Sequence, residues 1–113
     1  MNGTQDPTII GLQNVFLSYK EAIINTSLSG PTLFQHVLKA LLGYVQKCLA
    51  IQMYHVMMII TDGEIHDMRE TIDVIVELSK FPVSIIIIGV GQDEFENMQR
   101  LDGDKQRLRN SSN

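Results

Sequence analysis

The 113 residues are enough for one domain at most, and a hydrophobic content of 44% excludes general disorder. A net charge of −4, with Lys and Arg scattered along the chain, excludes a basic surface for nucleic acid. The single cysteine, Cys48, rules out an internal disulfide, so we expect a reducing, cytoplasmic environment. No apolar run reaches the roughly 20 residues of a membrane-spanning helix.

The N-terminal part of the chain is predicted to form two amphipathic helices joined by a polar loop. Asp6-Pro7-Thr8 is typical of a helix entry, and apolar residues then recur at helical spacing from Leu12 to Ile24. The loop from Asn25 to Pro31 is rich in Ser, Asn and Gly. A second helix is expected to begin at Thr32, because Gln35 completes a capping box with it.

Two apolar runs in the C-terminal part are predicted to be strands buried on both faces. The first runs from about Tyr54 to Thr61, and the second, with four consecutive isoleucines, from Val83 to Val90. Short apolar runs bounded by turn residues are typical of a parallel sheet that helices cover on both faces. Between them, Asp67 and Glu70 form a second capping box, which starts a helix that Phe81-Pro82 ends.

The order strand, helix, strand is that of a βαβ unit, so the two strands should be parallel. A short helical turn is expected from Asp93 to Met98. Parallel sheets normally have more than two strands, and three helices do not cover such a ribbon well. We therefore expect an incomplete doubly wound α/β fold with about two parallel strands and three helices, as a piece of a larger α/β domain.

The carboxyl end of the first strand carries the leading functional candidate. Asp62 follows this strand directly, on a turn that Gly63 makes tight. Ligands of open α/β sheets bind at this edge, so Asp62 is placed where a ligand would lie. A loop carboxylate that only accepts backbone hydrogen bonds is the alternative for Asp62.

Three blocks of sequence, in their order and spacing, resemble the von Willebrand factor A (vWA) domain in the variant found in copines. They are Tyr19-Lys20-Glu21-Ala22-Ile23 leading to Ser29-Gly30-Pro31-Thr32, then Ile60-Thr61-Asp62-Gly63 with Asp67-Met68, and Phe81-Pro82-Val83-Ser84-Ile85-Ile86-Ile87-Ile88-Gly89-Val90-Gly91 continued by Met98 and Leu101-Asp102-Gly103-Asp104. The resemblance extends from about Gly11 to Leu108. It divides the chain into a polar lead-in (1–10), a partial copine-type vWA domain (11–104) and a polar tail (105–113).

The resemblance implies part of a metal-ion-dependent adhesion site, which in A domains binds Mg²⁺ or Mn²⁺ at the carboxyl edge of the sheet. By resemblance, Thr32 and Asp62 match two of its ligands. The family's Asp-x-Ser-x-Ser-type motif has no counterpart here, so the site is expected to be incomplete. Glu64 departs from the family pattern, in which an apolar residue usually follows Asp-Gly. Helix capping is the alternative role for Thr32.

The resemblance implies a non-enzymatic protein-interaction module. In copines, Ca²⁺-dependent phospholipid binding belongs to paired C2 domains that this chain lacks, so membrane association is expected only in a longer form. One alternative is a truncated product without autonomous function that self-associates through an exposed sheet edge. Another is a Mg²⁺-dependent phosphoryl-transfer or hydrolase fragment using Asp62, which the absence of a nearby Lys or Arg after the second strand disfavours.

The remaining motifs give weaker evidence of a functional site. Gly89-x-Gly91 lacks the third glycine of a dinucleotide loop. The histidines at 36, 55 and 66 are not at metal-ligand spacing, so we expect His36, His55 and His66 to be structural or solvent-exposed. No nucleic-acid partner or catalytic residue is predicted.

Overall fold

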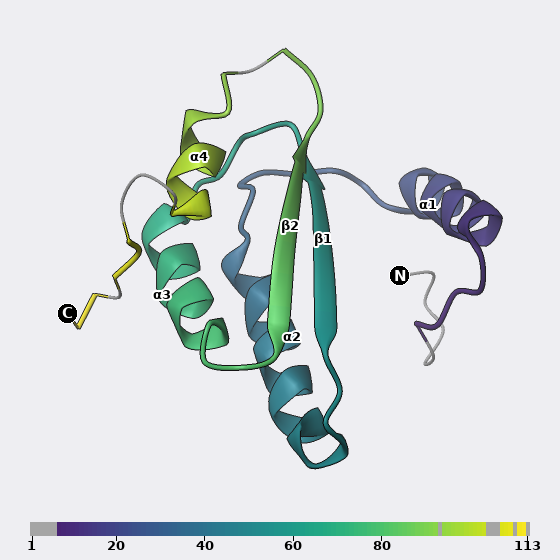
Figure 1. The fold of residues 1–113 in the computed structure, drawn as a ribbon. Helices are drawn as coiled ribbons and strands as arrows, with labels where there is room; N and C mark the ends of the chain where they lie inside the picture. The colour runs from purple at the N-terminus through teal and green to yellow at the C-terminus, as the bar shows by residue number, and fades with distance from the viewer. Residues whose placement is uncertain (1–6, 93, 104–106, 110, 113) are drawn as a thin grey trace. The chain divides into compact units, whose positions relative to one another are not determined.

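The computed structural model describes residues 7–92, 94–103, 107–109 and 111–112, in two compact units, Met1–Gly30 and Pro31–Asn113. The first unit contains α1 (Leu12–Asn25). The second contains, in order, α2 (Gln35–Cys48), the 3₁₀ turn η1 (Leu49–Ile51), β1 (His55–Thr61), α3 (Met68–Leu78), β2 (Val83–Gly89) and α4 (Glu96–Asp102) (Figure 1). The predicted partial α/β fold is confirmed, and α4 is a complete short helix where a helical turn was expected.

The N-terminal unit consists mainly of α1, whose apolar side chains are exposed. The helix begins at Leu12, later than the predicted entry near Thr8, because Gly11 has a φ of 79° that a helix cannot include. Leu12 is 85% exposed and Phe16 is 62% exposed. Asp6, which the predicted entry included, lies outside the described residues. None of the described helices is long and apolar enough to cross a membrane.

In the C-terminal unit, β1 and β2 form a parallel two-stranded sheet, as the βαβ pattern predicts. His55 pairs with Val83 at one end and Thr61 with Gly89 at the other. One face of the sheet packs against the core side chains of α2, α3 and α4. The sheet residues on this face are Met57, Ile59, Val83, Ile85 and Ile87. Leu38 of α2 and Leu78 of α3 are the most completely buried apolar residues of this core.

The second face of the sheet is apolar and exposed. Side chains alternate between the faces of a strand, so every second residue points away from the core. These residues are Val56, Met58 and Ile60 of β1 and Ile86 and Ile88 of β2, which are 41–68% exposed. Within Pro31–Asn113, the strands are therefore buried on one face, where the sequence predicts burial on both. Both apolar runs form strands as predicted, and the described helices of Pro31–Asn113 form a core on one of the two faces.

Candidate functional site

Two loops meet at the carboxyl ends of the strands, where one follows β1 and the other follows β2. The Val90 N–H donates to the Thr61 carbonyl at 2.8 Å, which continues the pairing of the chains beyond the end of β2. Between the loops lies a hollow of about 430 Å³, lined by Asp62, Gly63, Glu64, Val90, Gly91, Gln92 and Asn97. Among the described residues, two carboxylates and two amides thus share this edge, which is where α/β sheets bind their ligands.

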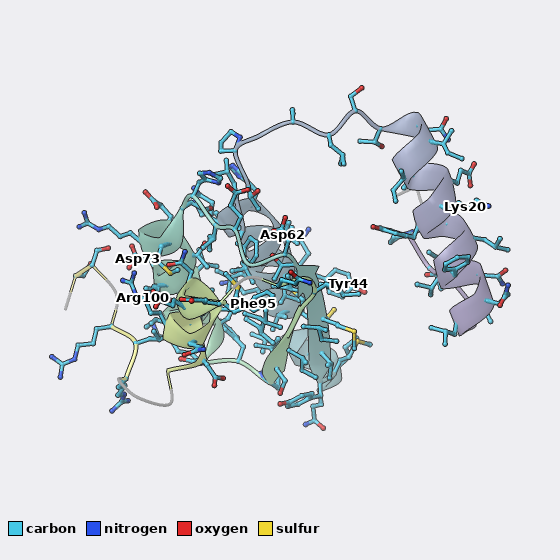
Figure 2. The ribbon with its side chains drawn as sticks, turned by 90° about the horizontal axis from the view of Figure 1, so that it is seen from above. Lys20, Tyr44, Asp62, Asp73, Phe95 and Arg100 are labelled. Carbon is cyan, nitrogen blue, oxygen red and sulfur yellow. The ribbon has the colours of Figure 1, made fainter. Side chains whose placement is uncertain are left out.

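Asp62 lies at this edge as predicted, and its side chain is exposed. Figure 2, which looks down on the carboxyl ends of the strands, labels Asp62 near these ends. Asp62 Oδ1 accepts the N–H of Glu64 at 3.2 Å, a local turn bond. Gly63 adopts the expected tight turn with φ 102°, and its N–H donates to Thr61 Oγ1 at 3.2 Å. No described group donates to Oδ2 of Asp62, so one carboxylate oxygen is available to a ligand.

Thr32 is held to the β1–α3 loop by His66. The backbone N–H of Thr32 donates to the ring atom Nδ1 of His66 at 3.1 Å. The backbone N–H of His66 donates in turn to the Thr32 carbonyl at 3.0 Å. Because Nδ1 accepts a hydrogen bond, the ring proton of neutral His66 is on Nε2, which lies 3.6 Å from Glu64 Oε1. A series of contacts from Thr32 through His66 to Glu64 thus connects Thr32 with the loop that carries Asp62. Thr32 itself is not among the residues lining the hollow.

The capping box predicted for Thr32 and Gln35 is wrong. The helix α2 begins at Gln35, and no side-chain bond from its N-cap residue, Phe34, closes its start. Asp67, far away in sequence, takes this role instead. Its Oδ1 accepts the Phe34 N–H at 3.0 Å and its Oδ2 accepts the Gln35 N–H at 2.8 Å. A carboxylate at a helix N-terminus also has a favourable interaction with the helix dipole.

The second predicted capping box, Asp67 with Glu70, is wrong in mechanism although the start of α3 at Met68 agrees with it. Asp67 occupies the N-cap position of α3 but makes no cap bond there. Its Oδ1 instead accepts the Thr71 hydroxyl at 3.2 Å. Asp67 is 4% exposed and Thr71 is completely buried. This single carboxylate therefore joins the starts of α2 and α3.

The environment of Asp67 favours its charged form. Burial acts to raise the pKa of Asp67, but the N–H groups of Gln35 and Phe34 and the hydroxyl of Thr71 outweigh it. The net pKa of Asp67 is lowered from its ordinary value of 3.8. Sequence reasoning missed this role, and the only signal for it was the place of Asp67-Met68 in the second block of the family resemblance.

The copine family model matches residues 1–113. The chain belongs to the copine family. It is 43% identical to Protein BONZAI 1 of Arabidopsis thaliana over 116 residues, which cover 99% of the chain and 20% of that protein. It is 47% identical to Copine-B of Dictyostelium discoideum over 100 residues, covering 83% of the chain and 18% of that protein. It is 39% identical to Nicotinic receptor-associated protein 1 of Caenorhabditis elegans over 105 residues, which cover 92% of the chain and 17% of that protein.

This copine chain spans about a fifth of the length of the curated relatives it matches. The three blocks that resembled copines all lie within the matched residues, including Thr32 and Asp62. What the relatives' names describe belongs to much longer proteins. The comparisons therefore give this chain its family.

The described residues of the copine chain do not by themselves fit a complete metal site. Among them, no group of three or more His, Cys, Asp or Glu residues is placed to hold an ion. Mg²⁺ requires about six oxygen ligands, of which Thr32 and Asp62 supply at most two. The metal roles of Thr32 and Asp62 stay predictions, and we assign no chemical step to an ion on these residues.

Proposed function

We propose that this copine chain acts as a non-enzymatic protein-interaction module whose binding edge is the hollow beside Asp62. The observation that carries the proposal is the exposed Asp62 carboxylate, with one oxygen held by the Glu64 N–H and the other available. Glu64, Gln92 and Asn97 add further polar groups to the same hollow. Such an edge suits a basic or amide-rich segment of a partner protein, since its acceptors outnumber its fixed donors.

A metal ion enters this proposal only as an assisting ligand. We propose that Thr32 and Asp62 are two ligands of a Mg²⁺ or Mn²⁺ site that needs further oxygens from outside the described residues. The module would act in the cytoplasm, and it would reach a membrane only through C2 domains of a longer copine, which bind phospholipid with Ca²⁺. A phosphoryl-transfer function for Asp62 has less support, because no Lys or Arg is among the described residues lining the hollow.

We expect the chain to bind Mn²⁺ with a dissociation constant no tighter than about 1 mM, the weak end of the range for oxygen-ligand sites. Water-proton relaxation during Mn²⁺ titration measures this directly. Asp62→Ala should remove whatever binding is seen, whereas Asp102→Ala, which removes an exposed carboxylate at the end of α4, should not. Equal binding by the wild type and Asp62→Ala would remove Asp62 from the metal site.

The interaction proposal is tested separately, by capture of proteins on the immobilised chain with Mg²⁺ and with EDTA. We expect a set of proteins that is captured by the wild type and by Asp102→Ala and lost with Asp62→Lys, which reverses the charge in the hollow. Loss with EDTA as well would show that the ion takes part. Capture that is unchanged by Asp62→Lys would contradict the proposed binding edge.

The exposed sheet face favours a second candidate, which is self-association of the chain. Met58, on this face, is 58% exposed, and both strands have one edge without a neighbouring strand in the described structure. Such strands are templates for pairing with another chain. We expect the weight-average mass in sedimentation to rise with concentration, and Met58→Lys to shift this rise to about tenfold higher concentration. Gln46→Lys, on the exposed side of α2, is the control, and a concentration-independent mass for the wild type would exclude this candidate.

A further inference from the structure

All four arginines of the chain lie around two adjoining hollows, although they look scattered in the sequence. Arg69 comes from α3, Arg100 from α4, and Arg107 and Arg109 from the segment that follows. One hollow of about 470 Å³ is lined by Arg100, Arg107 and Arg109 together with Ile72, Glu96, Gln99, Gly103 and Leu108. The other, of about 350 Å³, is lined by Arg69, Arg100 and Arg109 with Met68, Ile72, Asp73 and Ser111.

The two hollows are continuous parts of one surface. Ile72, Arg100 and Arg109 line both of them. Figure 2 shows Arg100 and Asp73 on the side of α3 and α4 along which the C-terminal segment runs. No residue lining the hollow at Asp62 lines either of these two, so they form a separate site.

Asp73 fixes the C-terminal segment on α3 and thereby places the last two arginines. Its Oδ1 accepts the Ser111 N–H at 2.7 Å, and its Oδ2 accepts the Ser111 hydroxyl. The Nε–H of Arg69 donates to the same hydroxyl oxygen at 3.3 Å. The Ser111 hydroxyl and N–H lower the pKa of Asp73, with a smaller contribution from the charge of Arg69. Both oxygens of Asp73 are therefore occupied by Ser111, and it serves the site as an anchor.

The arginines have no described counter-charge in contact. Within the described part of the chain, the one ion pair of a Lys or Arg side chain is Lys80–Glu77, so none includes an arginine. Among the described residues of the walls, two carboxylates, Glu96 and Asp73, stand against four guanidinium groups. This concentration of positive charge occurs in a chain whose net charge is −4. All four arginine residues are exposed, so their guanidinium groups are accessible to an anion that enters these hollows.

We propose that these two hollows bind an anion that carries phosphomonoester groups on an organic scaffold. Guanidinium groups donate paired hydrogen bonds that match the geometry of phosphate oxygens. A phosphomonoester has three terminal oxygens and close to two charges, so it satisfies several guanidinium groups, which a carboxylate with two oxygens does not. The volumes, about 470 and 350 Å³, are those of sites for small organic ligands rather than for a bare ion. Because Arg100 and Arg109 line both hollows, a ligand with two phosphate groups would use both.

The site is tested with inositol trisphosphate as the soluble probe, followed by calorimetry and by the NMR signals of the arginine Nε–H groups. We expect saturable binding with one ligand per chain and shifts of the arginine signals. The double variant Arg100→Gln with Arg109→Gln should bind at least about tenfold more weakly, since it removes guanidinium groups from both hollows. The matched control, Lys20→Gln with Lys47→Gln, loses the same charge from exposed positions of α1 and α2 and should keep its affinity.

Equal weakening in the two double variants would overturn the proposal, because it would show general attraction to positive charge. Absence of saturable binding by the wild type would overturn it as well. Replacing both arginines with lysine provides a further test, since charge is kept and the paired hydrogen bonds are lost. We expect this variant to bind more weakly than the wild type, and unchanged affinity would contradict the role of the guanidinium geometry. Circular dichroism of each variant checks that the helices are intact.

A vesicle experiment distinguishes the two sources of such a phosphate. Phosphatidylcholine vesicles with and without phosphatidylinositol bisphosphate are sedimented with the wild type and the Arg100→Gln, Arg109→Gln variant. Binding that needs the phosphorylated lipid, is displaced by inositol trisphosphate and is lost in the variant would identify a lipid headgroup. Saturable binding of the soluble probe without vesicle binding would identify a soluble phosphorylated compound. Vesicle binding that persists in the variant would contradict use of this site by lipid.

Discussion

Asp67→Ala is expected to lower the free energy of unfolding of the chain by about 4–5 kcal/mol, the lower end of what three lost hydrogen bonds to a charged group give at about 1.5–3 kcal/mol each. The change leaves the N–H groups of Phe34 and Gln35 and the hydroxyl of Thr71 without their acceptor. It also removes the cap of α2 and a favourable charge at its N-terminus. Urea unfolding followed by circular dichroism measures the difference.

Two control variants separate this explanation from the capping boxes expected from the sequence. Asp67→Asn keeps one acceptor oxygen and the shape of the side chain, so it should cost about half as much as Asp67→Ala. Glu70→Ala removes the residue on which the predicted box depends. Glu70 is exposed, so its loss should change stability by no more than about 0.5 kcal/mol. A Glu70→Ala cost as large as that of Asp67→Ala would mean that a conventional capping box operates after all.

The pH dependence of stability gives an independent test of Asp67. Its pKa in the folded chain is below the ordinary value of 3.8, so folding favours the charged form. The resulting stabilisation is fully present above 3.8 and is lost as the pH falls through the lowered pKa of the folded state. The difference in unfolding free energy between the wild type and Asp67→Asn should therefore become smaller as the pH falls below 3.8. A constant difference down to the acid transition would contradict the assignment.

The neighbouring isoleucines Ile85 and Ile86 should respond very differently to the same substitution. Ile85 packs against the core, whereas Ile86 lies on the second face of the sheet and is 45% exposed. Ile85→Ala should cost about 2 kcal/mol, the lower end of the range for a buried isoleucine. Ile86→Ala should cost less than about 1 kcal/mol, because it leaves no enclosed cavity. Both are measured by urea unfolding of the dilute monomer.

Equal costs for the two variants would show that the second sheet face is covered in solution. Repeating the Ile86→Ala measurement at rising protein concentration then identifies the cover. If the loss of unfolding free energy on Ile86→Ala grows with concentration, the face is covered by a second copy of the chain. If the loss is independent of concentration, another segment of the same chain covers it.

The strands were predictable because their evidence is local. Apolar runs that end in Thr61-Asp62-Gly63 and Gly89-Val90-Gly91 define both the strands and the edge at which Asp62 lies. Burial of the second face was not predictable, since an apolar run shows that a residue suits an interior but not which element covers it. In Pro31–Asn113, the core helices occupy the other face.

The candidate site was predictable only in part, for a similar reason. A capping box is recognised from residues three apart, whereas the cap of α2 comes from Asp67, 33 residues beyond Phe34. The contact of Thr32 with His66 joins residues 34 apart. The arginine site depends on Arg69 and Arg109 meeting after α3, α4 and Ser111 have packed. Such contacts belong to the tertiary structure and leave no pattern at fixed spacing in the sequence.

Thr61 uses both of its oxygens to fix the two loops at the edge of the sheet. Its carbonyl accepts from Val90 and its hydroxyl from Gly63, and the residue is buried. Ordering a mobile backbone residue costs about 1–2 kcal/mol of conformational entropy, which a partner would otherwise have to offset on binding. Here folding has already ordered the walls beside Asp62. A partner that binds there therefore needs fewer contacts for a given affinity and meets the same geometry at each encounter.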